Sequence, residues 1–197
     1  MKNKFLKLLL SSQILLIISL LIKSISFAEE LSIKDIVISG DISEIRASSF
    51  LKGNLDSDIL ETIKSGIPTT FTYYIELYKK QSLRFDKKIS SKTVKNTVEY
   101  DNLKKEYRAI QDINKETKNS LLKNINEAES WIRGLNNIPI ADDNVLRVET
   151  PYYLKVKAKL KSIKFIFPLN YVLFFFSVFD KDTEWQKSPL FLIKESL

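Results

Sequence analysis

The side chains that could do chemistry in this chain are carboxylates, hydroxyls and amines, because its 197 residues include no histidine and no cysteine. That composition excludes serine–histidine triads, thiol nucleophiles, imidazole acid–base catalysis and nearly all zinc, copper and haem sites. What remains is carboxylate chemistry, serine–lysine chemistry and the binding of hard cations such as Ca²⁺ by oxygen ligands.

Three patterns match that remaining chemistry, each incompletely. Ser120 and Lys123 have the Ser-x-x-Lys spacing of penicillin-recognising enzymes, but the supporting Ser-Asp-Asn and Lys-Thr-Gly elements are missing. Residues 180–184 place oxygen ligands at alternate positions, yet the glycine and the late glutamate of a Ca²⁺ loop are absent, and Phe191 stands at the twelfth position. The stretch 142–144 contains oxygen ligands for a cation, but its sequence is more typical of a turn. We therefore expect no catalytic residue, no metal and no cofactor, with a carboxylate-based or Ser–Lys hydrolase as an alternative.

Lysines alternate along a strand that the pattern predicts over 151–165. Lys155, Lys157, Lys159 and Lys161 point one way, and apolar side chains point the other way. Alternate residues of a strand are about 6.7 Å apart on one face, so the four ammonium groups would form a ridge of about 20 Å. Such a ridge fits contact with an anionic partner or membrane surface. It also fits a solvated face, or an edge strand that its charges protect from pairing with other chains.

Tyrosines occupy the polar face of another predicted strand, which begins at residue 67 and continues to residue 80. The apolar face is continuous, while the opposite face carries Tyr74 and Tyr78 between threonine, glutamate and lysine side chains. Tyrosines on an exposed strand face commonly pair across strands, and they also serve in recognition surfaces. We expect one of these two roles for both residues.

An aromatic block covers residues 165–179 and includes Phe174, Phe175 and Phe176. It is too short and too interrupted to span a bilayer, which takes about 20 apolar residues. It could form a buried element that closes the core. Alternatively it is an apolar patch that docks on a partner or enters a membrane interface.

Residues 1–28 have the pattern of a secretory signal peptide. A basic start precedes an apolar run over 8–22, and Ser26 and Ala28 provide the small residues of a cleavage site. We expect cleavage after Ala28, a single domain over 29–197, and a location in the bacterial periplasm or cell envelope. The formal net charge of +7 includes four lysines of the leader, so the exported domain would be only mildly basic, and we expect no nucleic-acid partner.

Hydrophobic periodicity predicts which elements position these side chains. Alternation predicts strands over 31–40, 44–52, 67–80, 92–100, 107–113 and 151–165, helical spacing predicts helices over 56–65 and 117–135, and a loop is expected over 136–144. The fold class is therefore mainly β with two helices (α+β), as an antiparallel β-sandwich-like domain. A single curved sheet packed on the second helix is the alternative.

Two motifs resemble those of an uncharacterised exported bacterial family, a domain of unknown function. Gly-Ile-Pro-Thr-Thr-Phe at 66–71 is similar to its Gly-Ile-Pro-x-Thr-Phe signature, and 100–107 matches its Tyr-Asp-x-Leu-x-x-x-Tyr element. The resemblance covers roughly 31–190. It implies a periplasmic or membrane-associated protein encoded near membrane sensor kinases, with no catalytic residues to carry over. Without the resemblance, the positions of the motif residues in turns and strands predict a structural role for them. These residues are Gly66, Pro68, Phe71, Tyr100, Asp101 and Tyr107.

These observations favour a non-enzymatic interaction module of the cell envelope. Its expected partner is an envelope or membrane protein, such as the outer part of a sensor kinase, bound through the lysine ridge and the tyrosine face. The alternative is peripheral binding to anionic lipid through the aromatic block.

Overall fold

The computed structural model describes residues 30–55, 57–114, 116–142, 144–161 and 181–193. Its helices are α2 (Ser57–Lys64) and α3 (Ile125–Arg133). Its strands are β1 (Ser32–Gly40), β2 (Glu44–Lys52), β3 (Thr69–Lys79), β4 (Lys87–Asp101), β5 (Glu106–Ile113), β6 (Glu116–Leu122), β7 (Gly134–Asp142), β8 (Pro151–Lys161), β9 (Lys181–Asp182), β10 (Gln186–Lys187) and β11 (Phe191–Leu192).

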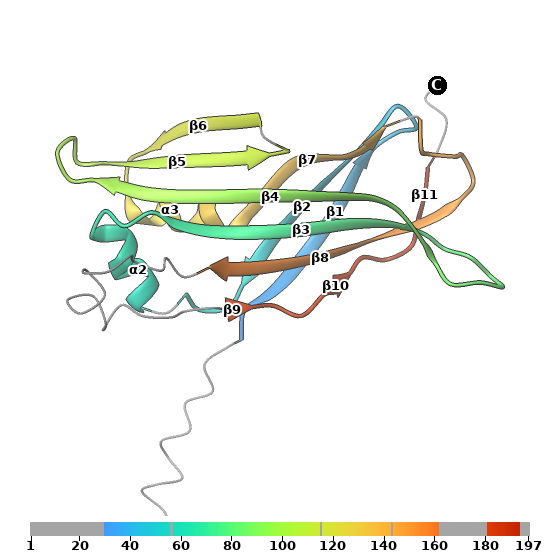
Figure 1. Cartoon of the computed structure of the whole chain (residues 1–197), viewed down its shortest axis with the longest axis horizontal. Coiled ribbons are helices and arrows are strands. Elements are labelled where there is room, and N and C mark those ends of the chain that lie inside the picture. Colours follow the sequence, from blue (N-terminus) through green and yellow to red (C-terminus); the bar gives the residue numbers. More distant parts are fainter. Residues whose placement is uncertain (1–29, 56, 115, 143, 162–180, 194–197) are drawn as a thin grey trace, which may run out of the picture.

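The strands form two antiparallel sheets. The smaller sheet has the order β1-β2-β7, and the larger has the order β10-β8-β3-β4-β5-β6, with β9 and β11 also paired to β8. Figure 1 shows the small sheet crossing obliquely behind the large one, with α3 beneath β4 and β5. This arrangement confirms the prediction of a mainly β, sandwich-like fold with two helices, and it excludes the single curved sheet.

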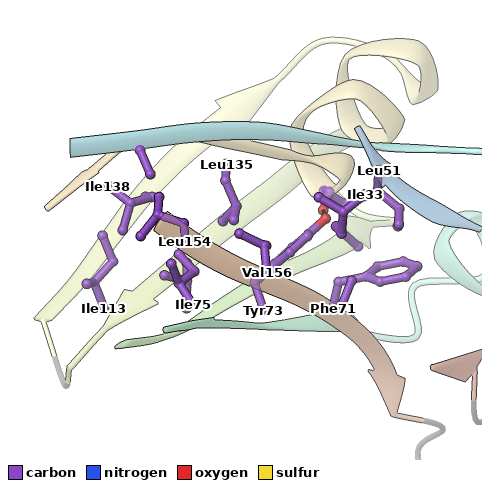
Figure 2. Packing of buried hydrophobic residues seen from close by; sticks show 14 of the residues in the cluster. Ile33, Leu51, Phe71, Tyr73, Ile75, Ile113, Leu135, Ile138, Leu154 and Val156 are labelled. Atoms are coloured by element: carbon purple, nitrogen blue, oxygen red, sulfur yellow. Dashed lines mark hydrogen bonds between the residues drawn. The ribbon is translucent and has the colours of Figure 1, made fainter. Parts of the chain in front are cut away.

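The core lies between the two sheets. One face of β3 supplies Phe71, Tyr73, Ile75 and Leu77, all of them at most 1% exposed. Figure 2 shows Phe71, Tyr73 and Ile75 opposite residues of the small sheet such as Ile33. Burying an aliphatic or aromatic side chain of this size contributes about 1.5–3 kcal/mol. The strict alternation of β3 therefore fixes which of its faces remains outside.

Two buried polar side chains join the large sheet to the segment around α3. The Tyr73 hydroxyl donates to the Ile132 carbonyl at 2.8 Å, and the Asn96 amide donates to the Gly134 carbonyl at 2.8 Å. Gln111 donates in turn to the Asn96 side-chain oxygen at 3.0 Å. Since each of these groups is paired, the sheet holds the helix and the start of β7 in one position.

The prediction of a helix over 117–135 is wrong in its first third. Residues 116–122 form β6 on the edge of the large sheet, and Leu121, expected on the buried stripe, is 65% exposed. The helix begins later, because the Asn124 side chain accepts a hydrogen bond from the Glu127 amide at 2.9 Å and caps it there. From that point Ala128 and Ile132 are buried as expected.

The loop predicted over 136–144 is also wrong, because strand β7 covers most of it. Ile138 and Ile140 are buried at alternate positions, and the strand pairs with β2. Pro139 suggested a loop, since proline lacks a backbone donor. The β2–β7 pairing shifts register on both sides of the Arg46–Pro139 pair, so the ladder accommodates this residue at an irregularity.

Candidate functional site

The register between β3 and β8 brings the predicted lysines and tyrosines together. β8 lies antiparallel to β3 and pairs Lys157 with Tyr74, Lys155 with Glu76, and Tyr153 with Tyr78. Residues directly opposite each other share a face of a sheet, and this face is the one turned away from the core. We call it the lysine–tyrosine face; its residues are Tyr74, Tyr78, Tyr153, Lys155, Lys157, Lys159 and Lys187.

Two tyrosines of this face stack on each other. The rings of Tyr78 and Tyr153 lie 5.3 Å apart between centroids, at an interplanar angle of 7°. The Lys155 ammonium lies 5.0 Å from the Tyr78 ring centroid, and the Lys187 ammonium lies 3.8 Å from that of Tyr153. Cations over aromatic faces are attracted to the ring quadrupole. Tyr78 therefore serves cross-strand packing, the first of the two roles expected for it.

Two carboxylates fix the hydroxyl groups of this stack. Glu76 accepts from the Tyr78 hydroxyl at 2.8 Å and from the Lys88 ammonium at 2.7 Å. Burial alone would raise the pKa of Glu76, but these hydrogen bonds and the positive charges nearby lower it below its ordinary value. Tyr153 donates to Asp86 at 2.9 Å, and burial together with this hydrogen bond raises the pKa of Tyr153 to about 12.

A third carboxylate, Asp182 of β9, lies between two lysines of the predicted ridge. Its oxygens are 3.1 Å from the Lys157 ammonium and 3.3 Å from the Lys159 ammonium. Burial would raise the pKa of Asp182, but these lysines lower it overall. Lysines still outnumber carboxylates on and around this face: Lys80, Lys88, Lys155, Lys157, Lys159 and Lys187 against Glu76, Asp86 and Asp182.

Tyr74 is the aromatic side chain of the face that stays available. It is 36% exposed and has no hydrogen-bond or ring partner among the described residues. Its cross-strand neighbours are Lys157 on β8 and Thr93 on β4. The last lysine of the predicted ridge, Lys161, ends β8, and its side chain lies outside the described part. The face thus presents an exposed tyrosine beside the lysine-bearing strand β8.

The structure excludes the interpretation of β8 as a protected edge strand. On one side β8 pairs with β3, and on the other side it pairs with β9, β10 and β11. Two buried hydroxyls complete that second side: Thr183 accepts from the Ala158 amide at 3.0 Å, and Ser188 accepts from the Leu154 amide at 2.9 Å. The lysines therefore do not guard an open edge.

Four residues lie around the ridge where the sequence analysis did not place them, although one of them, Asp182, belongs to the stretch 180–184 considered there for cation binding. Asp182 and Lys187 belong to strands of two residues, which are too short for any periodicity to show. Lys88 reaches Glu76 because β4 carries one extra residue, Ile89, between the pairs Leu77–Ser90 and Tyr78–Lys88. Asp86 has only a local signal, since an aspartate that closes a turn is common.

The other candidate groups are separated or fall outside the described residues. The block 165–179, with Phe174, Phe175 and Phe176, lies outside them. Ser120 is on β6, which ends at Leu122, so the helical turn that would put Ser120 and Lys123 on one face is missing. Among the described residues, no three carboxylates are grouped so as to hold a metal ion. Within the same residues, no helix has the length and apolar character needed to cross a membrane.

The two sequence motifs meet at one structural junction. Gly66 has φ of +81° and ends α2, with the Ile67 amide bonded to the Thr62 carbonyl and the Gly66 amide to the Ile63 carbonyl. A Cβ on Gly66 would lie 2.7 Å from the Asn102 side-chain nitrogen and 3.0 Å from the Tyr100 carbonyl oxygen. The end of α2 therefore packs directly on the β4–β5 turn.

Each remaining motif residue has a structural contact. Asp101 accepts from the amides of Leu103 and Lys104 and closes that turn, which lowers the pKa of Asp101. Tyr100 and Tyr107 pair across the hairpin, with ring centroids 4.7 Å apart. Phe71 is buried in the core, and Pro68 directly precedes β3.

Comparison with known proteins gives a family and no named function. Neither the curated proteins nor the solved structures contain a match to this chain. One family model, described as a domain of unknown function, matches residues 28–189, which is most of the chain and includes every described element up to β10. The chain therefore belongs to the DUF4390 family of domains of unknown function.

Proposed function

We propose that the chain is a non-enzymatic interaction module, exported to the bacterial periplasm or cell envelope, which binds an acidic region of an envelope or membrane protein through the lysine–tyrosine face. The outer part of a membrane sensor kinase is the partner that best fits the neighbourhood implied by the sequence resemblance. The observation that carries the proposal is the position of Tyr74, exposed on a sheet face with lysines beside it.

The chemistry of the face supports a protein partner. Tyrosine is enriched where binding energy concentrates in protein interfaces, because it buries a large rigid surface and keeps a polar tip. A surplus of lysine steers an acidic partner and fixes its orientation. The stack of Tyr78 on Tyr153 and the bonds of Asp182 hold the lysines in place before binding, so less side-chain freedom is lost on association.

Crosslinking in the native envelope tests the proposal. Wild type is compared with the triple reversal K155E/K157E/K159E and with Y74A, and recovered proteins are identified. We expect one membrane protein with wild type, and recovery lowered about tenfold or more in both variants. Cell fractionation of the same samples checks the envelope location.

A matched reversal controls for net charge. K64E/K118E/K123E changes the charge by the same amount at exposed positions on α2, on β6 and just beyond it, and we expect recovery close to wild type. Circular dichroism confirms that each variant is folded. Equal loss in both triple variants, or full recovery with folded Y74A and K155E/K157E/K159E, contradicts the proposal.

A further inference from the structure

The connection between β3 and β4 exposes two large apolar side chains at its tip. Leu83 is 96% exposed and Phe85 is 99% exposed, the highest values among the large hydrophobic residues that the structure describes. We call residues 81–86 the β3–β4 tip. Figure 1 shows that it projects beyond the rest of the large sheet at one end of the molecule. Exposing large apolar side chains to water is unfavourable, so the exposure of Leu83 and Phe85 requires an explanation.

The β3–β4 tip is a closed loop with several anchoring contacts at its base. Asp86 accepts from the Gln81 amide at 3.1 Å and from the Tyr153 hydroxyl at 2.9 Å, and its carboxylate pairs with the Lys80 ammonium at 3.3 Å. The Lys80 amide also donates to the Pro151 carbonyl at 2.8 Å. These contacts tie both ends of the loop to each other and to β8. The exposure of Leu83 and Phe85 is thus a property of an anchored loop.

Basic residues surround the apolar apex. Arg84 stands between Leu83 and Phe85, and further lysines lie on either side: Lys79 at the end of β3 and Lys80 just after it, and Lys87 and Lys88 at the start of β4. Asp86 is the one acid between residues 79 and 88, and it is bonded within the loop. An apolar apex with a cationic collar matches the layered chemistry of a bilayer surface, where acyl chains lie beneath anionic headgroups.

The shape of this region favours a membrane over a protein partner. A protein would have to offer a pocket for two adjacent projecting side chains and acids on both flanks of it. A bilayer offers both at any point, because its interface yields to an inserted loop. Leu192 of β11 pairs with Pro151, the same residue that Lys80 contacts, and it is 61% exposed. Leu192 is therefore a third exposed apolar side chain near the base of the tip.

We propose that the β3–β4 tip inserts Leu83 and Phe85 into the interface of a bilayer containing anionic lipid, with Arg84 and Lys87 at the headgroups. This contact does not depend on the partner proposed above, since it uses the end of the large sheet and leaves Tyr74 open. It would hold the domain on a membrane while the lysine–tyrosine face meets a protein beside it.

Tryptophan quenching by lipids brominated on the acyl chain tests insertion of the tip itself. The full chain carrying F85W is mixed with vesicles of phosphatidylcholine alone, or with vesicles in which phosphatidylglycerol replaces part of it. Wild type gives the background from Trp131 and Trp185. We expect additional quenching in F85W on the vesicles with phosphatidylglycerol and little on phosphatidylcholine alone.

L103W is the matched control, because Leu103 is 95% exposed at the β4–β5 turn and lies beside Lys104 and Lys105. It should show no added quenching. Vesicle sedimentation supplies a second measurement: L83S/F85S should lower the vesicle affinity about tenfold or more, and L103S should not. If F85W is no more quenched than wild type, or if L103W is quenched equally, the proposal is wrong, even where the chain sediments with vesicles through another segment.

Discussion

Glu76 is one of the carboxylates whose ionised form stabilises the lysine–tyrosine face, through Tyr78 and Lys88. Its pKa in the folded chain is lowered from an ordinary value of 4.5 by its bonds to Lys88 and Tyr78. A carboxylate with a lowered folded pKa stabilises the protein above its unfolded pKa and loses that contribution as the pH falls through the folded value. We expect the free energy of unfolding of wild type to fall below about pH 4.5, more steeply than that of E76Q.

Urea unfolding of both proteins between neutral and acidic pH measures this difference. Asp86, Asp101 and Asp182 also have lowered pKa values, so the fall in wild type alone does not isolate Glu76. E116Q removes an exposed carboxylate of β6 that has no partner among the described residues, and its curve should stay parallel to wild type. Parallel curves for wild type and E76Q would show that Glu76 has no such role.

The face on which a single residue of the site lies was predictable wherever alternation along its strand determines that face. Alternation alone places Tyr74 and Tyr78 on one face of β3, and Lys155 and Lys157 on one face of β8. It does not say that the two faces coincide, because register between distant strands depends on the whole sheet. Nor does it show that Asp182 lies between two of the lysines.

At the scale of elements, Gly66 joins the end of α2 to the β4–β5 turn. G66A would place a Cβ in contact with Asn102 and the Tyr100 carbonyl, at a φ that L residues seldom adopt. We expect a loss of about 2 kcal/mol or more in the free energy of unfolding, measured by chemical denaturation. G134A is the comparison, since Gly134 has φ of −96° and its nearest contacts are at 3.3 Å. A loss no larger in G66A than in G134A would contradict this account.

Elements with a clear hydrophobic periodicity were predicted from the sequence. The errors arose where that periodicity is absent or does not mark the boundary of an element. β3 and β8 show clear alternation: β3 lies within the predicted range 67–80, and β8 covers 151–161 of the predicted range 151–165, whose last four residues lie outside the described part. From Glu116 to Ser120 β6 is polar on both sides, and it takes its conformation from pairing with β5, so these residues carry no strand signal. The capping interaction between Asn124 and Glu127 marks the true start of α3, and a pattern based on apolar spacing passes over it.

At the scale of the whole molecule, the C-terminal strands complete the large sheet through side chains as well as backbone. Thr183 and Ser188 are buried, and their hydroxyls accept from amides of β8. T183V and S188A leave these amides unpaired, and we expect each to lower the free energy of unfolding by about 1–3 kcal/mol. Thermal or urea unfolding of each variant measures the loss.

The control for these variants is S65A. Ser65 donates to the Glu61 carbonyl at the exposed end of α2, and removing it should change stability by less than about 0.5 kcal/mol. If T183V and S188A are as stable as S65A, the C-terminal strands contribute little to closing the sheet. The two-layer architecture was predictable from the composition and the hydrophobic periodicity, whereas the pairing of the short C-terminal strands with β8 was not.

The position of β8 in the sequence also determines when both edges of β3 can be paired during synthesis. β3 and β4 are neighbours along the chain and can form their hairpin early, but the second partner of β3 emerges only after residue 151. Until then one side of an apolar strand stands open, and open strands recruit other chains. The yield of native protein should therefore depend on how quickly the last quarter of the chain arrives. Slow translation of residues 151–197, or too little chaperone to bind the incomplete chain, would therefore lower the yield of native protein more than a modest loss of stability in the folded domain.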